Sequence, residues 1–596
     1  MNFYYNPLDE KCKSVIGAVA TTENLILNVY TDASYCKLSL YSDEKGKTEV
    51  ISLSKTDFGF TLLLCNLKVG LYFYYFIADG VIYGRDDNLI ATTQIPNVNE
   101  KSFQLLVYNK SKTPTWTQGG IIYQIFPDRF CSVEPTFKKN QKIKKWEDMP
   151  DYLPDSNGKV LNDDFYGGNF KGIISKLEYL KKLNVSIIYL NPIQKAFSNH
   201  RYDTADYMQI DSLLGDDSDF KLLCEKCAEK GIKVILDGVY NHTGDDSVYF
   251  NKYKNFESVG AYNDKNSKYY DWYIFEKYPD KYKCWWGIEI LPTINKNSLE
   301  FEEYIAGENG VIEKFMRLGA SGFRLDVVDE LKEDFVKKIK AKILKENENG
   351  FLIGEVWEDA TNKIAYDTRR HYFLGDELDS VMNYPLKNAI ISYLRLGDSI
   401  ELKKVCKEQI NNYPFDSLNM LMNLLGTHDT PRIINELSRN VPPKTRQECA
   451  TQVIEPYKIQ KGLQKLKLAV VLQFLLYGIP SIYYGDEIAL EGEKDPFNRR
   501  TFNWYRINCE TLKFYRKISK IRKENSVFKN GKTTILQTDN KVFAFKRTLK
   551  NKEVYVFVNA GENLYDIEFE SAKKNLINDE ISTKFTLKNN DFIILK

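Results

Sequence analysis

The stretch GFRLDVVDE, from Gly322 to Glu330, is an apolar run that ends in a cluster of charged residues. The same pattern recurs in VILDGVYNHTG (234–244), FLIGEVWEDA (351–360) and NLLGTHDTPR (423–432). Strands of a parallel barrel bury their length and present catalytic side chains at their carboxyl ends. Four such segments in one chain therefore predict a parallel barrel with a site at one mouth.

Short apolar runs alternate with helical patterns from Ile121 onward, which predicts an α/β fold, a (β/α)8 TIM barrel. The eight runs begin at Ile121, Ser186, Val234, Gly322, Phe351, Asp379, Met422 and Ile479. A long polar segment rich in Tyr and Trp follows the third run, and residues 243–299 are predicted to form an excursion domain over the barrel mouth. The catalytic barrel with this excursion is predicted to span residues 115–527.

Both flanks of the barrel have β-like patterns. Residues 1–114 contain short apolar runs at even spacing, which favours an amino-terminal β-sandwich, carbohydrate-binding-like and a candidate for dimerisation. Residues 528–596 alternate in the same way and predict a small carboxy-terminal β-sandwich. The chain is therefore expected to have three domains.

Composition limits the partners and the location. The formal net charge is only +2, so neither nucleic acid nor a membrane is expected as a partner. The amino-terminal residues lack a signal-peptide pattern, and ten scattered cysteines agree with a reducing compartment, so we expect a cytoplasmic protein. Aromatic residues make up 14% of the chain. Two interpretations are open: these residues form a rich core, or they are platforms on which sugar rings stack.

Three carboxylates end three of the predicted strands. Arg324 lies two residues before Asp326, so both side chains point to one face, where the arginine can hold a carboxylate nucleophile ionised. Glu355 is a candidate general acid, and Asp429 is a further strand-end carboxylate. A structural ion pair and a helix cap are the alternatives for Asp326 and Asp429. The set suits glycoside hydrolysis, and a metal-dependent hydrolase is disfavoured because no His-rich ligand set accompanies it.

These segments resemble the four hallmark regions of the α-amylase family, glycoside hydrolase family 13. They occur in the family's order: D-x-x-x-N-H at Asp237, Asn241 and His242, then GFRLD, GEVW and HD. Further stretches of the barrel are similar to the family as well: IFPDRF (125–130), FYGGNFKGI (165–173), NHRYDTADY (199–207) and GIPSIYYGDE (478–487). The resemblance covers about residues 121–504.

The resemblance implies a role for each residue of the candidate site. Asp326 would be the nucleophile, Glu355 the general acid/base and Asp429 the transition-state stabiliser. His242, His428 and Arg324 would bind the sugar at the cleavage subsite, and Tyr202 would stack beneath it. Two interpretations are open for each of two further residues. Asp237 is expected either to contact the sugar or to be structural, and Trp357 either to be a platform for the sugar or to be a packing residue.

Finer features resemble the cyclomaltodextrinase, neopullulanase and maltogenic amylase group. These are the amino-terminal β-domain, LPTIN (291–295) and DPFNRR (495–500). In that group Asp495 and Arg499 would contact sugar on the non-reducing side, and the amino-terminal domain often mediates a homodimer. Three residues depart from the group pattern: Leu291 replaces a Met, Thr293 replaces a Lys, and Glu358 replaces a His close to the leaving-group subsites.

We expect neither a required cofactor nor a metal ligand among the site residues. The stretch CSVEPTF (131–137) lacks the Asn/Asp-rich calcium loop of many relatives, and Asn169 stands where an Asp is common. No calcium site is therefore expected there, although Asn241 could serve a different one.

The sequence predicts a retaining hydrolase of an α-glucan oligosaccharide, acting on α-1,4 bonds of cyclodextrins, maltooligosaccharides or pullulan. A glucanotransferase or an α-1,6-acting enzyme on the same barrel is the first alternative. A barrel that binds glycans without catalysis is the second, and the intact set of Asp326, Glu355 and Asp429 argues against it.

Overall fold

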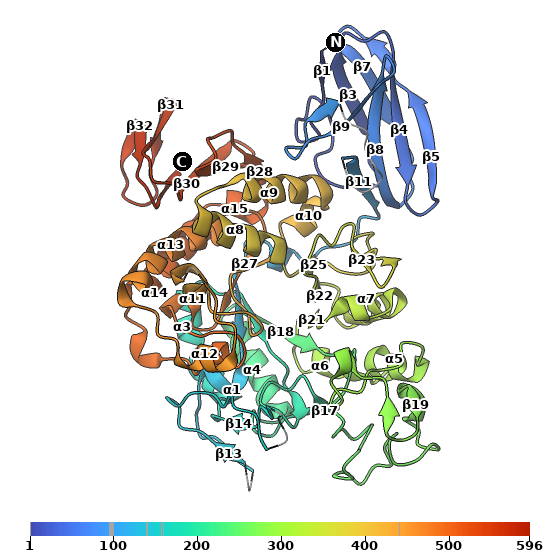
Figure 1. Ribbon diagram of the computed structural model, residues 1–596, viewed down its shortest axis with the longest axis vertical. Coiled ribbons are helices and arrows are strands. Elements are labelled where there is room, and N and C mark those ends of the chain that lie inside the picture. The colour runs from blue at the N-terminus through green and yellow to red at the C-terminus, as the bar shows by residue number, and fades with distance from the viewer. Residues whose placement is uncertain (1, 94–100, 139–140, 157, 159, 440) are drawn as a thin grey trace.

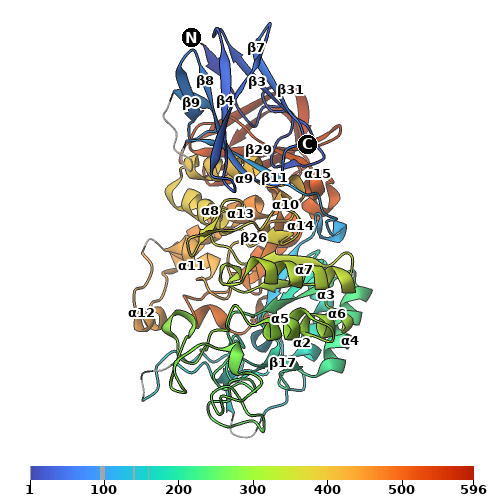
Figure 2. The same cartoon turned by 90° about the vertical axis from the view of Figure 1, so that its right-hand side faces the viewer.

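The structure is a computed structural model that describes residues 2–93, 101–138, 141–156, 158, 160–439 and 441–596. The barrel occupies the middle and lower part of Figure 1, and the two β-rich ends of the chain lie on its side that carries α8 and α9. Figure 2 shows the amino- and carboxy-terminal regions at the same end of the molecule. The predicted limits between domains, and those of the excursion, stay predictions.

Eight parallel strands form the barrel, as the sequence predicts. Their order around the sheet is β25-β22-β21-β18-β15-β12-β27-β26. A single parallel bridge between Met382 and Met422 joins the two ends of the sheet, so the barrel is nearly closed. The strands are β12 (Ile122–Ile125), β15 (Ile187–Leu190), β18 (Lys233–Gly238), β21 (Gly322–Leu325), β22 (Phe351–Gly354), β25 (Ser380–Val381), β26 (Met422–Leu424) and β27 (Ile479–Tyr483).

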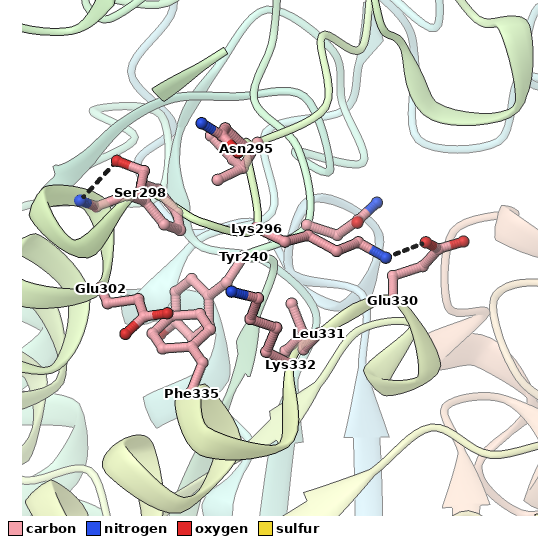
Figure 3. A pocket seen from close by; sticks show the side chains of 12 residues that line it. Tyr240, Asn295, Lys296, Ser298, Glu302, Glu330, Leu331, Lys332 and Phe335 are labelled. Atoms are coloured by element: carbon pink, nitrogen blue, oxygen red, sulfur yellow. Dashed lines mark hydrogen bonds and ion pairs between the residues drawn. The ribbon is translucent and has the colours of Figure 1, made fainter. Parts of the chain in front are cut away.

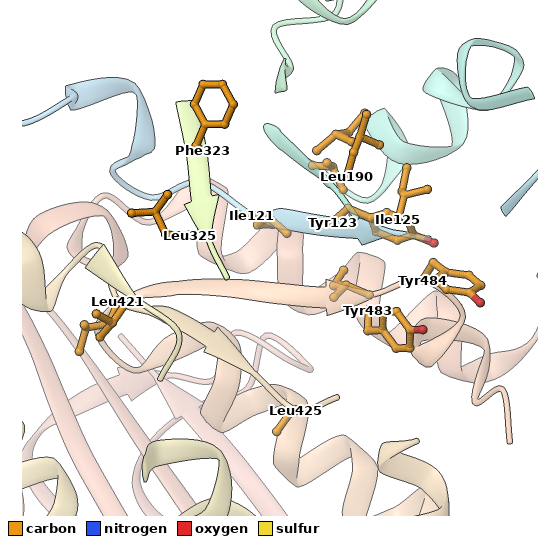
Figure 4. Packing of buried hydrophobic residues seen from close by; sticks show 14 of the residues in the cluster. Ile121, Tyr123, Ile125, Leu190, Phe323, Leu325, Leu421, Leu425, Tyr483 and Tyr484 are labelled. Atoms are coloured by element: carbon orange, nitrogen blue, oxygen red, sulfur yellow. The ribbon is translucent and has the colours of Figure 1, made fainter. Parts of the chain in front are cut away.

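Successive residues of the barrel strand β15 alternate between two buried clusters. Ile187 and Tyr189 of β15 belong to a cluster inside the barrel, whereas Ile188 and Leu190 pack outward against the helices. Figure 4 shows outward-facing side chains of this kind, among them Leu190, Phe323 and Leu325. Because side chains along a strand point to opposite faces in turn, every second residue must point into the barrel.

Helices cover the outside of the barrel. α4 begins with a capping box in which Asp216 accepts hydrogen bonds from the backbone of Ser218 and Asp219. α8 ends at Gly397, whose φ of 66° is left-handed. The main helices are α2 (Phe170–Ser175), α3 (Leu177–Lys182), α4 (Asp217–Glu229), α5 (Leu299–Ala306), α6 (Val311–Arg317), α7 (Glu333–Glu346), α8 (Tyr384–Leu396), α9 (Ile400–Asn412), α11 (Ile433–Ser438), α13 (Pro456–Leu475) and α14 (Glu510–Glu524).

Two sheets form the amino-terminal region, which agrees with the predicted sandwich. One has the order β1-β3-β7-β6, and the other contains β10-β9-β8-β11-β2 with β4 paired to β8 and β5 paired to β4. Between them lies a separate core that includes Leu27, Leu38 and Phe76. The strands are β1 (Phe3–Tyr4), β2 (Val19–Ala20), β3 (Leu25–Thr31), β4 (Cys36–Ser42), β5 (Lys47–Ser52), β6 (Ser54–Thr56), β7 (Gly59–Leu64), β8 (Gly70–Ala78), β9 (Val81–Arg85), β10 (Ala91–Thr93) and β11 (Phe103–Tyr108).

The carboxy-terminal region has a four-stranded sheet, β28-β29-β30-β33, and a hairpin, β31-β32. Its strands are β28 (Lys532–Ile535), β29 (Val542–Leu549), β30 (Lys552–Asn559), β31 (Tyr565–Lys574), β32 (Ile581–Leu587) and β33 (Asp591–Leu595). The excursion carries the short strands β19 (Phe275–Lys277) and β20 (Lys281–Tyr282). In the described part of the chain, no helix is both long and apolar enough to cross a membrane.

Candidate active site

The alternation of the barrel strands brings Asp237 and Arg324 together. The two residues are paired in register across β18 and β21, and both point inward. Arg324 Nη1 donates to Asp237 Oδ1 at 2.7 Å and to Asp326 Oδ1 at 2.8 Å, and Nη2 lies 2.9 Å from Glu355 Oε2. One fully buried guanidinium therefore connects three carboxylates from three neighbouring strands. We call these four residues the cleft floor.

Glu355 is held by two further donors. The backbone N–H of Val327 donates to Glu355 Oε2 at 2.9 Å, and the indole N–H of Trp357 donates to Oε1 at 3.2 Å. Val327 directly follows Asp326 and has a φ of 36°. A left-handed backbone is unfavourable for a β-branched residue, so this strain is retained where it aims an N–H at the candidate acid.

A second set of hydrogen bonds aligns Tyr202 and His428, two aromatic residues of the candidate site. The hydroxyl of Tyr202 donates to Asp237 Oδ2 at 2.7 Å and lies 2.6 Å from His428 Nε2, and the two rings are parallel. On its other side, His428 Nδ1 lies 3.0 Å from Gln124 Nε2. Tyr189 also donates to Asp237 Oδ2, at 2.6 Å. Tyr202 is therefore fixed to the same aspartate that Arg324 holds.

Burial sets the protonation of the carboxylates. It raises the pKa of Asp326 well above the usual value; Glu355 and Asp237 add to that rise, and Arg324 opposes it. Burial, followed by the charge of Glu355, raises the pKa of Asp429 to about 7. Like charges so close disfavour the simultaneous ionisation of Asp326 and Asp429, whereas the charge of Arg324 acts to lower both pKa values.

The histidines of the site are neutral at pH 7. Burial lowers the pKa of His242 to about 4 and that of His428 well below 6.5. His242 Nε2 lies 3.1 Å from the carbonyl oxygen of Tyr202, and its ring stacks on Trp285 with centroids 5.4 Å apart. Neutral imidazoles can therefore offer hydrogen bonds to sugar hydroxyls without a competing charge.

Asp495 and Arg499 lie beside Asp429. Arg499 Nη1 lies 2.7 Å from Asp495 Oδ1, its Nη2 lies 3.9 Å from Asp429 Oδ1, and its Nε donates to the carbonyl oxygen of His428 at 3.1 Å. The arginine thus joins the segment after β27 to the segment after β26. This places the pair next to Asp429 at the cleft.

A cleft of about 1380 Å³ opens over these residues, and almost all of the predicted site residues line it. Those at its surface are Tyr202, His242, Asp326, Glu355, Trp357, His428, Asp429, Asp495 and Arg499. Asp237 and Arg324 lie beneath this surface and are almost fully enclosed. Their positions favour holding the other groups in place over contact with sugar.

Sequence reasoning missed four residues that complete the site. Gln124 and Tyr189 point into the barrel by strand alternation, a signal that the sequence does contain. Val327 has no sequence signal, because its unusual φ depends on the packed loop. Tyr366 lines the cleft from a loop beyond Trp357, and nothing in its neighbours marks it.

The two asparagines considered for calcium lie in different places. Asn169 caps α2: its Oδ1 accepts from Gly172 N at 2.8 Å and its Nδ2 donates to Val133 O at 2.7 Å. Asn241 borders a small cavity of about 20 Å³ with Tyr240, Asn295 and Glu330 (Figure 3). Across the described ranges, no group of three or more His, Cys, Asp or Glu residues is arranged to hold a metal ion.

Residues 124–537 match the model of the alpha-amylase catalytic domain. The chain belongs to the alpha-amylase family. It is 32% identical to a cyclomaltodextrinase of Thermoanaerobacter pseudethanolicus, over 84% of this chain and 81% of that protein. It is also 36% identical to an amylopullulanase of Thermoanaerobacter thermohydrosulfuricus, over 92% of this chain and 41% of that protein.

Solved structures agree with this family assignment. The cyclic alpha-maltosyl-(1→6)-maltose hydrolase of Arthrobacter globiformis superposes with a TM-score of 0.67 at 25% identity, covering 81% of this chain and 99% of that one. This chain covers less than half the length of the amylopullulanases that it matches.

Proposed function

We propose that this chain is a retaining α-glucan hydrolase that cleaves α-1,4-glucosidic bonds through a covalent glycosyl-enzyme. The observation that carries the proposal is the single buried Arg324 that pairs with Asp326 and Glu355 at once. That arrangement supports the short carboxyl separation, about 5–5.5 Å, that retaining glycosidases use.

In the first step, Asp326 attacks the anomeric carbon while Glu355 gives its proton to the leaving oxygen. Arg324 and Val327 both contact Oε2 of Glu355, so the proton is carried by Oε1, which also accepts the indole N–H of Trp357. Arg324 holds Oδ1 of Asp326, so Oδ2 forms the new bond to carbon as the bond to the leaving oxygen breaks. Positive charge that develops on the sugar ring is stabilised by Asp429 and the other cleft carboxylates.

In the second step, water attacks the same carbon and the bond to Asp326 breaks. Glu355, now ionised, accepts the proton from that water and is restored to its acid form. A sugar hydroxyl can replace water at this step, which would give transglycosylation. No cofactor enters either step.

The proposal covers three classes of substrate, namely cyclodextrins, linear maltooligosaccharides and pullulan. The relatives' names include a cyclomaltodextrinase and amylopullulanases, and these names support an α-glucan as the substrate. Homodimer formation and a cytoplasmic location stay predictions of the sequence, and a solution mass measurement would check the first.

The test is a product analysis with maltotriose, pullulan and β-cyclodextrin, with the anomeric form of the first product followed by NMR. We expect reducing ends from at least one substrate, and newly released sugar in the α-configuration. Dominant products longer than the substrate would instead identify a glucanotransferase. A protein that binds maltoheptaose but releases no reducing ends would overturn the hydrolase proposal.

A further inference from the structure

The loop that follows Glu355 ends in a tight hairpin. Its strands are β23 (Ile364–Ala365) and β24 (Thr368–Arg369), paired antiparallel. The two residues between them, Tyr366 and Asp367, have φ values of 52° and 57°. Two consecutive left-handed residues are what a two-residue type I′ hairpin requires. The hairpin therefore has a defined tip, and Tyr366 is part of that tip.

The tip reaches across to the excursion. The Tyr366 hydroxyl donates to Glu330, and its pKa is raised to about 12, first by burial and then by that bond, with a hydrogen bond from Trp286 opposing. Lys296 Nζ lies 5.0 Å from the ring centroid of Tyr366 and 3.2 Å from Glu330 Oε2, a pair drawn in Figure 3. Three loops thus meet at one point on the cleft edge.

Exposed aromatic surface faces the cleft at this point. Trp286 is 79% exposed, Tyr366 is 60% exposed and Trp357 is 45% exposed, and all three line the cleft. Large exposed rings that line one cleft are typical of a binding surface, and the apolar faces of sugars suit aromatic planes. We call Trp286, Trp357 and Tyr366 the leaving-side wall.

The wall lies on the side of the leaving group because of its position relative to Glu355. The general acid must contact the leaving oxygen. Trp357 donates to that same carboxyl, and the chain runs from Trp357 directly to the hairpin. Asp495 and Arg499 lie on a different segment, beside Asp429.

The base of the hairpin is held by the amino-terminal sandwich. Arg369 makes a two-pronged ion pair with Asp43, Nε to Oδ2 at 2.8 Å and Nη2 to Oδ1 at 3.0 Å. The buried side chain of Gln104 donates to Thr361 Oγ1 at 2.8 Å and accepts from Asn362 Nδ2 at 2.7 Å. Only 14% of the Arg369 side chain and 17% of the Asp43 side chain are exposed, so solvent screens the pair less than an ordinary surface salt bridge.

We propose that the amino-terminal β-sandwich sets how tightly the cleft of its own chain binds the leaving portion of the glucan. Asp43 and Gln104 act as positioning residues: they fix the hairpin that presents Tyr366 against Trp286. The sugar units beyond the cleaved bond then stack on the leaving-side wall. This inference rests on the proposed hydrolase function, and it requires no second copy of the chain.

The test compares Asp43→Asn with Glu408→Gln. Glu408 on α9 pairs with Arg85 of the sandwich at 3.1 Å and has similar exposure, so it is a matched link between the same two regions away from the hairpin. Two substrates are used: maltoheptaose, which fills the leaving side, and α-maltosyl fluoride, which places no sugar there. Melting temperatures show that each variant is folded.

We expect Asp43→Asn to raise KM for maltoheptaose about three- to tenfold, the size of one weakened stacking contact, with little change for the fluoride. Glu408→Gln should leave both substrates near wild-type values. Tyr366→Ala, which removes the ring itself, should raise KM for maltoheptaose at least as much as Asp43→Asn does.

Equal behaviour of Asp43→Asn and Glu408→Gln would overturn the inference, as would equal damage to both substrates in Asp43→Asn. A folded Tyr366→Ala protein with an unchanged KM for maltoheptaose would overturn the role of the wall. Failure of the proposed function is a separate result, because the wild-type chain would then release no reducing ends from maltoheptaose.

Discussion

The cleft floor and the leaving-side wall are built in opposite ways. The floor consists of buried charges at strand ends, joined by ion pairs of 2.7 to 2.9 Å around Arg324. The wall consists of exposed rings on loops, and it is positioned by contacts such as Asp43 to Arg369, which are 326 residues apart. The floor can carry out one kind of chemistry, whereas the wall can vary without altering that chemistry.

This difference has a physical origin. A buried charge that loses its partner is strongly destabilising, by roughly 3–5 kcal/mol, so the floor tolerates few changes. An exposed ring contributes about 0.5–1.5 kcal/mol through stacking, and its loss leaves no unpaired charge behind. Changes in the floor should therefore affect turnover on every substrate, and changes in the wall should affect only substrates that reach it.

The largest effect is expected from Asp326→Asn. The amide keeps the shape of the side chain but cannot form the glycosyl-enzyme, so kcat should fall by at least about a thousandfold while maltoheptaose still binds. Steady-state kinetics with calorimetric binding would measure both quantities. Asp246→Asn is the control, because Asp246 lines the cleft and bonds to Asn255, away from Arg324. Wild-type-like turnover in Asp326→Asn would refute its assignment as the nucleophile.

Glu355→Gln should give a smaller and selective loss. Proton transfer contributes typically about 10²- to 10⁴-fold, so kcat on maltoheptaose should fall by that range. The fluoride substrate needs no proton on its leaving group and should be affected far less. Asp246→Asn, at a residue that bonds to Asn255 away from Glu355, should treat the two substrates alike. Equal damage to both substrates in Glu355→Gln would count against the acid role.

Val327→Gly tests whether the strain at the floor has a function. Glycine accepts a φ of 36° without strain, so the variant should melt at the same temperature or higher. The freer backbone should hold the N–H less firmly against Glu355, and kcat should fall about tenfold, as loss of precise positioning predicts. Val327→Ala keeps the strained backbone and separates the loss of the side chain from the loss of strain. Full activity in the glycine variant would show that the strain is incidental.

The smallest effect concerns stability and pH. The pKa of Asp429 is raised from 3.8 to about 7, so the folded protein binds more protons than the unfolded chain between these values. Its contribution to stability therefore falls as pH rises through that window. Asp429→Asn removes this penalty and should raise the melting temperature more at pH 8 than at pH 5, by on the order of 1–2 °C because solvent in the cleft screens the charge. Asp246→Asn should show the same shift at both pH values, and the reverse order for Asp429→Asn would contradict the assignment.

Much of the floor could be predicted before the structure was known. The eight barrel strands lie where the apolar runs place them, and Asp237, Arg324, Asp326 and Glu355 meet at one mouth as their strand-end positions imply. That Asp237 and Arg324 are enclosed beneath the cleft surface was harder to predict from the sequence. The depth of a side chain along the barrel axis depends on the stagger of all eight strands.

The sequence by itself determined the barrel, the family and the carboxylates of the floor. These depend on local periods: alternation along a strand decides which side chains point inward, and parallel strands bring their carboxyl ends together. Only the tertiary structure decided the left-handed backbone of Val327, the meeting of Tyr366 with Trp286, and the link from Asp43 to Arg369. Those contacts join segments far apart in the chain, and they exist only once separately folded regions pack against one another.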